Sequence, residues 1–310
     1  MNALTQSYEI AQPTPLHKKC LIAKLTMRRV TLTRQDIDLQ AQVRDQMDDQ
    51  AITLNRKLFR EDGNPVRSVF TAYNAIYTKH RELTFPYVDK GPRVLPVKLY
   101  ERYTSSIKED INNLNAKLEA LEGVYEQCID QDIAFRNKFK TVHISRDEYP
   151  SYEDILSGTS YALDIRPMPD SSHFVYGISE EDRQAFDANA KHLEDLIRQD
   201  TVSRITEPLK HLLEKIAVPI GTKTVGEDGK EVREGLFRDT TITNISDALK
   251  QVRSMAVEES PAFTKLLDDL EAKFKRYADH PEYLRESPFE RTQAHAELTA
   301  IETRLSGYDF

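Results

Sequence analysis

The sequence predicts a mainly α-helical fold: a bundle of long antiparallel helices, similar to a coiled coil, with a small antiparallel β-sheet at one end and an inserted β-hairpin. Three patterns carry this prediction. Apolar side chains recur at steps of four and three residues between about 96 and 140, a second helical stripe runs from about 179 to 218, and residues 20–31 alternate apolar with polar side chains. Steps of three and four place side chains on one helix face, whereas strict alternation places them on one face of a strand.

The segment from Pro96 to about Lys140 is the element around which we expect the bundle to form. Its seam is a heptad repeat that one charged residue, Asp132, interrupts. The seam residues are Ile107, Ile111, Leu114, Leu118, Leu121, Tyr125, Cys128, Phe135 and Phe139. A helix of this span is roughly 60 Å long at ~1.5 Å per residue, so other helices, or a second copy of the chain, must cover the seam.

The strand expected over residues 20–31 follows a lead-in. Residues 1–16 contain two prolines and no period, and we expect them to be mobile. Residues 17–310 are expected to form a single helical domain. The apolar positions of the strand are Leu21, Ala23, Leu25 and Met27, and they predict one buried face.

Two helices are expected between this strand and the central helix. Thr33 and Asp36 resemble a capping box, and the helix that they begin ends before Asp62. Its stripe is Ile37, Val43, Met47, Leu54 and Leu58. Asn64 followed by Pro65 predicts the start of a second, amphipathic helix that ends near residue 81.

Residues 83–96 form a corner that leads into the central helix. Three prolines and a glycine exclude a regular helix there, while aromatic and aliphatic side chains indicate that the segment packs as an ordered corner. Asp89 and Arg93 are the charged pair that we single out. They are interpreted either as an internal ion pair that clamps the corner or as a contact that presents Arg93 to a partner.

Helical and strand signals alternate after residue 140. Ser179 with Asp182 caps a long helix that Pro208 is expected to kink or split, and residues 219–238 are expected to form an exposed hairpin. The stripe of the long helix is Phe186, Ala190, Leu193, Ile197, Ile205, Leu209, Leu212 and Ile216. The other expected elements are a short strand over 141–145, a helical turn over 152–156, a strand over 162–166 that pairs with the first strand, and helices over 240–256, 261–277 and 288–305.

Composition narrows the class of protein. A net charge of −8 argues against non-specific binding of the whole chain to nucleic acid or an anionic membrane. The sequence has no apolar run long enough to span a membrane, and its first residues do not resemble a secretory signal. Two cysteines, Cys20 and Cys128, are too few to stabilise a chain of 310 residues through disulfide bonds, so we expect a cytoplasmic, reducing setting.

The usual catalytic and cofactor motifs are missing from the sequence. It contains no phosphate-binding loop, no zinc-protease helix, no di-iron signature and no nucleophile elbow. We therefore expect no cofactor and no metal, and we identify no catalytic residue. An enzyme whose site is assembled from separated acids and histidines remains an alternative.

One cluster of positive charge stands out on this acidic chain. Its members are Lys18, Lys19, Lys24, Arg28, Arg29 and Arg34. These residues are interpreted as the solvated face of a strand that pairs with acidic helices. The alternative is a contact with a polyanion or an acidic partner, which would make the chain a nucleic-acid-associated protein.

The corner and two later stretches resemble the signature of an uncharacterised family of tailed-bacteriophage and plasmid proteins, which is catalogued as a domain of unknown function. The matching residues are Leu83, Thr84, Phe85, Pro86, Tyr87, Asp89, Gly91, Arg93, Leu95, Pro96, Tyr100 and Tyr103, then 237–245, then Leu284, Arg285 and Arg291. Phe85 and Tyr87 stand where the family more often has Leu and Trp. The resemblance implies a mostly helical phage-type accessory protein of the host cell cytoplasm, with no catalytic residues to carry over.

Genes of that family often lie beside those of AAA-type ATPases and von Willebrand-type domains, which implies an adaptor role. Together with the long seam and the projecting hairpin, this favours a non-enzymatic scaffold or adaptor that acts through protein–protein contacts, with an AAA-type ATPase as one such partner. We also expect a homo-oligomer, most simply a two-fold dimer, because the one helix that matches the seam in length, over about 179–218, is expected to bend at Pro208 and so to leave part of the seam uncovered. The expected contact residues are Leu121, Tyr125 and Cys128.

Overall fold

The computed structural model describes residues 16–47, 51–59, 63–87, 91–138, 144–169, 179–220, 223–225, 231–233, 235–255 and 260–308. The chain is mainly helical, as the sequence predicts. It forms two compact units. Unit 1 comprises Met1–Ile22, Leu83–Tyr100 and Arg166–Phe310, and unit 2 comprises Ala23–Glu82 and Glu101–Ile165. The single domain expected over 17–310 stays a prediction.

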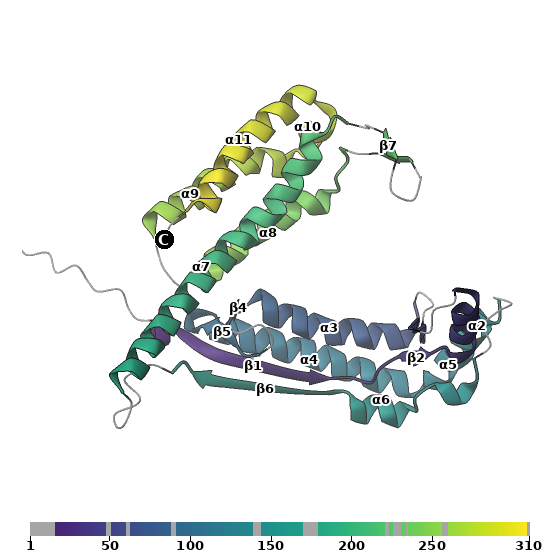
Figure 1. Cartoon of the computed structure of the whole chain (residues 1–310). Helices are drawn as coiled ribbons and strands as arrows, with labels where there is room; N and C mark the ends of the chain where they lie inside the picture. The colour runs from purple at the N-terminus through teal and green to yellow at the C-terminus, as the bar shows by residue number, and fades with distance from the viewer. Residues whose placement is uncertain are drawn as a thin grey trace, which may run out of the picture. The chain divides into compact units, whose positions relative to one another are not determined.

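A four-stranded antiparallel sheet has the strand order β4-β5-β1-β6. Strands β4 (Phe85–Pro86) and β5 (Arg93–Pro96) come from the corner, and Phe85 pairs with Val94. Strand β1 (Cys20–Arg28) ends earlier than expected. Strand β6 (Ser160–Pro167) lies beside β1 at the edge of the sheet (Figure 1), which confirms the predicted pairing.

Unit 2 contains α3 (Pro65–Glu82), α4 (Tyr100–Glu122), α5 (Tyr125–Arg136), the 3₁₀ turn η2 (Arg146–Glu148) and α6 (Tyr152–Gly158). The Asn64 side chain accepts a hydrogen bond from the Val66 amide at 3.0 Å, which confirms the predicted cap of α3. The apolar face of α3 is buried, and at its end a 2.7 Å hydrogen bond joins the His80 ring to the Tyr103 hydroxyl of α4.

The central segment is two helices rather than one. A 3₁₀ turn, η1 (Val97–Leu99), precedes α4, and α4 and α5 are separated at Gly123. The Val124 amide donates to the Leu121 carbonyl at 3.1 Å, a tightened three-residue turn where a continuous helix would use a four-residue step. Glycine favours such a break because it loses the most backbone entropy in a helix.

This break changes which residues of the seam are buried. Before it, Ile107, Leu114, Leu118 and Leu121 are buried, and Ile111 is half-buried. After it, the buried positions are Tyr125, Cys128, Ile129, Asp132 and Arg136. Phe135 is only half-buried, and Phe139 lies outside the described residues.

The helix expected from Asp36 towards Asp62 is wrong beyond Met47. Helix α2 spans Ile37–Met47. Strand β2 (Thr33–Gln35) precedes it, strand β3 (Asn55–Lys57) follows it, and the two strands pair antiparallel. Asp36 caps α2 through the Leu39 amide, but its other carboxylate oxygen pairs with the Arg56 guanidinium at 2.6 Å. This ion pair joins residues that are distant in the sequence and keeps the segment after α2 beside β2. A helical apolar periodicity does not predict such a contact.

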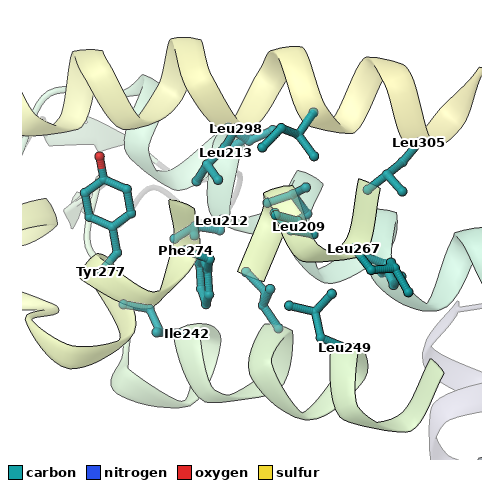
Figure 2. Packing of buried hydrophobic residues seen from close by; sticks show 14 of the residues in the cluster. Leu209, Leu212, Leu213, Ile242, Leu249, Leu267, Phe274, Tyr277, Leu298 and Leu305 are labelled. Carbon is teal, nitrogen blue, oxygen red and sulfur yellow. The ribbon is translucent and has the colours of Figure 1, made fainter. Parts of the chain in front are cut away.

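In unit 1, helices α7 (Glu180–Ala217), α8 (Asp239–Met255), α9 (Pro261–Asp279) and α11 (Pro288–Ser306) surround one apolar core (Figure 2). The short helices α1 (Leu16–Lys19) and α10 (Glu282–Glu286) were not expected from the sequence. Side chains of Ser179, Ser260 and Ser287 cap α7, α9 and α11, as predicted. Pro208 lies inside α7 and does not split it.

The expected hairpin is present as β7 (Lys223–Val225) and β8 (Glu231–Arg233), which pair antiparallel. The buried stripe of α7 begins at Leu193, because Ala190 is exposed; the side chain of Phe186 lies outside the described residues. Most of the strand expected over 141–145, and the lead-in over 1–15, also lie outside them.

We predict that Phe85→Ala lowers the free energy of unfolding by about 3 kcal/mol or more, because truncating a buried aromatic side chain leaves a cavity. Phe85 is 0% exposed, and the Arg204 guanidinium lies 5.6 Å from the centre of its ring. Phe289→Ala is the matched control, since Phe289 is 74% exposed and its loss should leave the denaturation midpoint close to that of the wild type. A loss under about 1 kcal/mol for Phe85→Ala in denaturant melts would contradict a buried corner.

Candidate functional site

The basic cluster is divided between the two units. Lys18 and Lys19 belong to unit 1, and the other four members belong to unit 2. Lys18, Lys24 and Arg28 are exposed, and Lys19 is half-buried. Lys24 and Arg28 alternate with half-buried side chains along β1, so they share the solvated face of that strand.

Two arginines of the cluster have structural contacts. The Arg29 guanidinium donates to the Asn74 side chain at 3.2 Å and lies 5.3 Å from the centre of the Phe70 ring, which ties the end of β1 to α3. The Arg34 Nε donates to the Glu148 carbonyl at 3.0 Å. Lys24, Arg28 and Arg29 are the exposed members of the cluster in unit 2, and of these Arg29 contacts α3.

Arg93 of the corner is half-buried and contacts Thr84. Its Nε donates to the Thr84 hydroxyl at 2.7 Å and its Nη2 to the Thr84 carbonyl at 3.0 Å. The same carbonyl accepts a hydrogen bond at 2.8 Å from Arg204 of α7, which also pairs with Asp200 at 2.6 Å. The corner is thus attached to α7 by two guanidinium groups. Asp89 lies outside the described residues, so its pairing with Arg93 stays a prediction.

Arg204 was not singled out from the sequence. It lies between Thr201 and Ile205, both of which are buried, and this position beside a buried stripe is the one local signal that marks it. Its partner is the backbone carbonyl of Thr84, and no sequence pattern shows which carbonyl will accept a hydrogen bond from a distant side chain.

Asp132 is a carboxylate of unit 2 that is 0% exposed. It accepts hydrogen bonds from the Phe59 amide at 2.9 Å, the Tyr149 hydroxyl at 2.8 Å and the Arg136 Nε at 2.8 Å. The Arg136 Nη2 also donates to the Lys57 carbonyl. Burial, and then the hydrogen bond to Asp132, raise the pKa of Tyr149, so its hydroxyl remains a proton donor to the carboxylate.

Phe59 has a left-handed backbone with φ 51°, which is unusual for a bulky residue. Such a conformation costs on the order of 1–3 kcal/mol and persists where the surroundings fix it. Here the amide donates to Asp132, and the ring packs edge-on against Tyr149 at 5.1 Å and lies 5.9 Å from Tyr125. The polar groups around Asp132 therefore serve to fix backbone segments in place.

Arg291 is the buried cation of unit 1. Its guanidinium donates to backbone carbonyls, and burial lowers the pKa of this group while leaving it charged at neutral pH. The accepting carbonyls belong to Lys215 (2.6 Å), Val218 (2.8 Å), Gly235 (3.0 Å), Ile216 (3.3 Å) and Leu284 (3.3 Å). A cation at the carboxyl end of α7 is favoured by the helix dipole, so Arg291 acts as a cap supplied from α11.

Gly235 is required at this cap. Its φ is +74°, and a Cβ atom there would lie 2.5 Å from the Pro219 carbonyl oxygen. Any other residue would push this backbone away from Arg291.

The two cysteines are buried thiols. Burial raises the pKa of Cys20 to about 12 and also raises that of Cys128, so neither is a thiolate nucleophile at neutral pH. Among the residues that the structure describes, no three His, Cys, Asp or Glu side chains are grouped so that they could hold a metal ion. Within the same residues, no helix combines the length and the apolar character needed to cross a membrane.

The expected self-association contact is wrong in its location. Leu121, Tyr125 and Cys128 are each 1% exposed. The Tyr125 hydroxyl donates to the Pro150 carbonyl at 2.6 Å, and the Asn64 side chain donates to the Cys128 carbonyl at 3.4 Å. The chain itself covers this part of the seam, so it is not available to a second copy. The oligomeric state stays a prediction.

We predict that Asp132→Ala lowers the free energy of unfolding by about 3 kcal/mol or more, because it leaves the Arg136 charge buried without its carboxylate. The matched control is Asp130→Ala, two positions away on α5, where an exposed carboxylate pairs with Arg146. We expect the control to keep a midpoint close to that of the wild type in urea melts. Equal effects of the two substitutions would show that the buried network does not hold unit 2.

We predict that Arg291→Ala destabilises the chain by about 3 kcal/mol or more, because several buried carbonyls lose their donor. Arg304→Ala is the control on the same helix, since Arg304 is 56% exposed and pairs with Asp269 at 3.5 Å. Hydrogen exchange should show faster exchange at the end of α7 in the first variant and not in the second. Unchanged exchange there would contradict the capping role.

Comparison of this chain with protein-family models, curated proteins and solved structures gives no match. The resemblance to a phage protein family therefore stays an expectation from the residues that carry it.

Proposed function

We propose that this chain is a non-enzymatic helical scaffold or adaptor that acts through protein–protein contacts. The observation that supports it most is the apolar surface of α2. Ile37 is 69% exposed, Leu39 39% and Met47 67%. Ile37 and Met47, the two most exposed of them, lie about 80° apart around the helix at ~100° per residue, whereas Leu39 points to the side opposite Ile37. Large apolar side chains exposed on one side of a surface element favour a contact with another molecule.

Polar contacts hold α2 in place and leave these side chains outward. Asp36 is anchored to Arg56, and the Gln40 side chain accepts a hydrogen bond from the Leu54 amide at 3.2 Å. A helix of about 11 residues is marginal by itself, so these anchors, more than apolar packing, determine its position. We infer that a protein partner covers Ile37 and Met47.

The resemblance to phage-type accessory proteins supports the same role and a host-cytoplasmic setting, with an AAA-type ATPase as one candidate partner. The buried charges also fit this role. Asp132, Arg204 and Arg291 each join separate segments of their own unit, so these charges stabilise the fold.

A second candidate function is binding of a polyanion such as nucleic acid. Lys24 and Arg28 support it, because both are exposed on the solvated face of β1. Phosphate contacts made by exposed Lys and Arg give affinities that fall steeply with salt.

The adaptor proposal is tested by affinity capture from cell extract with three matched forms of the chain. These are the wild type, Ile37→Ser with Met47→Ser, and a control with Gln42→Ser and Asp45→Ser, which changes exposed polar residues of α2. We expect a defined protein to be retained by the wild type and the control and lost from the apolar variant, whose melting temperature stays unchanged. Retention of the same proteins by all three forms would overturn the role of α2.

The polyanion candidate is tested by filter binding of labelled DNA and RNA across a salt series. A polyanion-binding chain would show affinity at low salt that falls steeply with salt and is lost on Lys24→Ala with Arg28→Ala. The matched control is Lys191→Ala with Arg183→Ala, two exposed cations of α7. Absence of binding at low salt, or equal loss in the control, would remove this candidate.

A further inference from the structure

Strand β6 (Ser160–Pro167) is the last strand of the four-stranded sheet, and no strand pairs with its outer side among the residues that the structure describes. Its side chains are exposed or half-buried, and none is buried. The opposite edge is β4, which has two residues, the second of them a proline, and packs against α7. A long edge strand presents backbone N–H and C=O groups that another strand can pair with.

β6 lacks most of the devices that prevent such pairing. Edge strands are usually protected by shortness, charged side chains (lysine above all), proline, a bulge or a covering helix or loop, and the charges of β6 are one residue of each sign, Asp164 and Arg166. β6 has eight residues and no lysine, and its single proline is its last residue.

The sequence of β6 is complementary to itself in one antiparallel register. In a two-fold pairing centred on Ile165, Asp164 of each copy faces Arg166 of the other, so two pairs of opposite charge form across the axis. On the other face of the sheet the same register brings Leu163 opposite Pro167 and Ile165 opposite itself, which is an apolar contact. A register centred on Asp164 instead would set two carboxylates opposite each other.

We infer that two copies of this chain pair through β6 in antiparallel orientation, with the register centred on Ile165, to make a continuous eight-stranded sheet. The register overlaps residues 163–167 of each β6 strand. Their main-chain hydrogen bonds, to which Pro167 contributes only its carbonyl, supply the affinity, and the charges select the register. Asp164 and Arg166 also interact within their own chain, and exposed ion pairs contribute little energy, so their effect is chiefly on the choice of partner strand. A dimer made in this way does not depend on the adaptor role, and it leaves Leu121, Tyr125 and Cys128 buried.

Charge reversal tests this pairing in light scattering at micromolar concentration. We expect the wild type to have the mass of two chains. Asp164→Arg alone places arginine opposite arginine, and Arg166→Asp alone places aspartate opposite aspartate, so each variant should dissociate with a constant raised on the order of tenfold or more. An equimolar mixture of the two variants restores opposite charges at both positions and should form a mixed dimer.

Glu181→Arg is the control, because Glu181 is exposed on α7, and it should remain dimeric. Circular dichroism checks that each variant keeps its helix content. A wild type with the mass of one chain would overturn the inference. So would dimeric single variants, or variants that fail to dimerise when mixed.

Discussion

The burial of one carboxylate, Asp132, constrains the segments of unit 2 that meet at α5. Moving an ionised carboxylate out of water costs several kcal/mol unless donors replace the lost hydration. The donors here come from separate places in the chain: the backbone at Phe59, the guanidinium of Arg136 and the hydroxyl of Tyr149. The buried charge is stable only when all three donors contact it, so the segments that carry these donors are fixed relative to α5.

Unit 1 uses the same physical device with the opposite charge. Arg291 replaces its hydration with backbone carbonyls, most of which belong to the end of α7. Both charges therefore organise irregular backbone, which apolar packing controls poorly because it has no directional preference. The regular helices around them are held by the apolar core, for example by Leu212 and Phe274 in Figure 2.

Local signals in the sequence were enough for the elements that apolar periodicity and caps define. The bounds of α3, α7, α8, α9 and α11 follow from stripes and from caps such as Ser179. Contacts between distant residues decided the rest. The pairing of Asp36 with Arg56 shortened α2, and the tightened turn at Gly123 divided the central helix.

The candidate sites were predictable only in part, for the same reason. Asp132 was visible in the sequence as a charge on an apolar seam, but its donors were not. Lys24 and Arg28 could be placed on a strand face by alternation alone. Arg204 and Arg291 bind main-chain oxygens, which every residue possesses, so no residue type marks their partners.

The contacts at the base of the hairpin affect how well the chain tolerates insertions between its two ends. Val218 and Gly235 both offer carbonyls to the Arg291 guanidinium, so the two ends of the intervening segment are joined at one point. When the ends of a loop are fixed, doubling its length costs only about 0.6 kcal/mol in closure entropy. The segment between them is therefore a natural place for insertions during evolution, and a practical one for grafting a tag or a foreign domain.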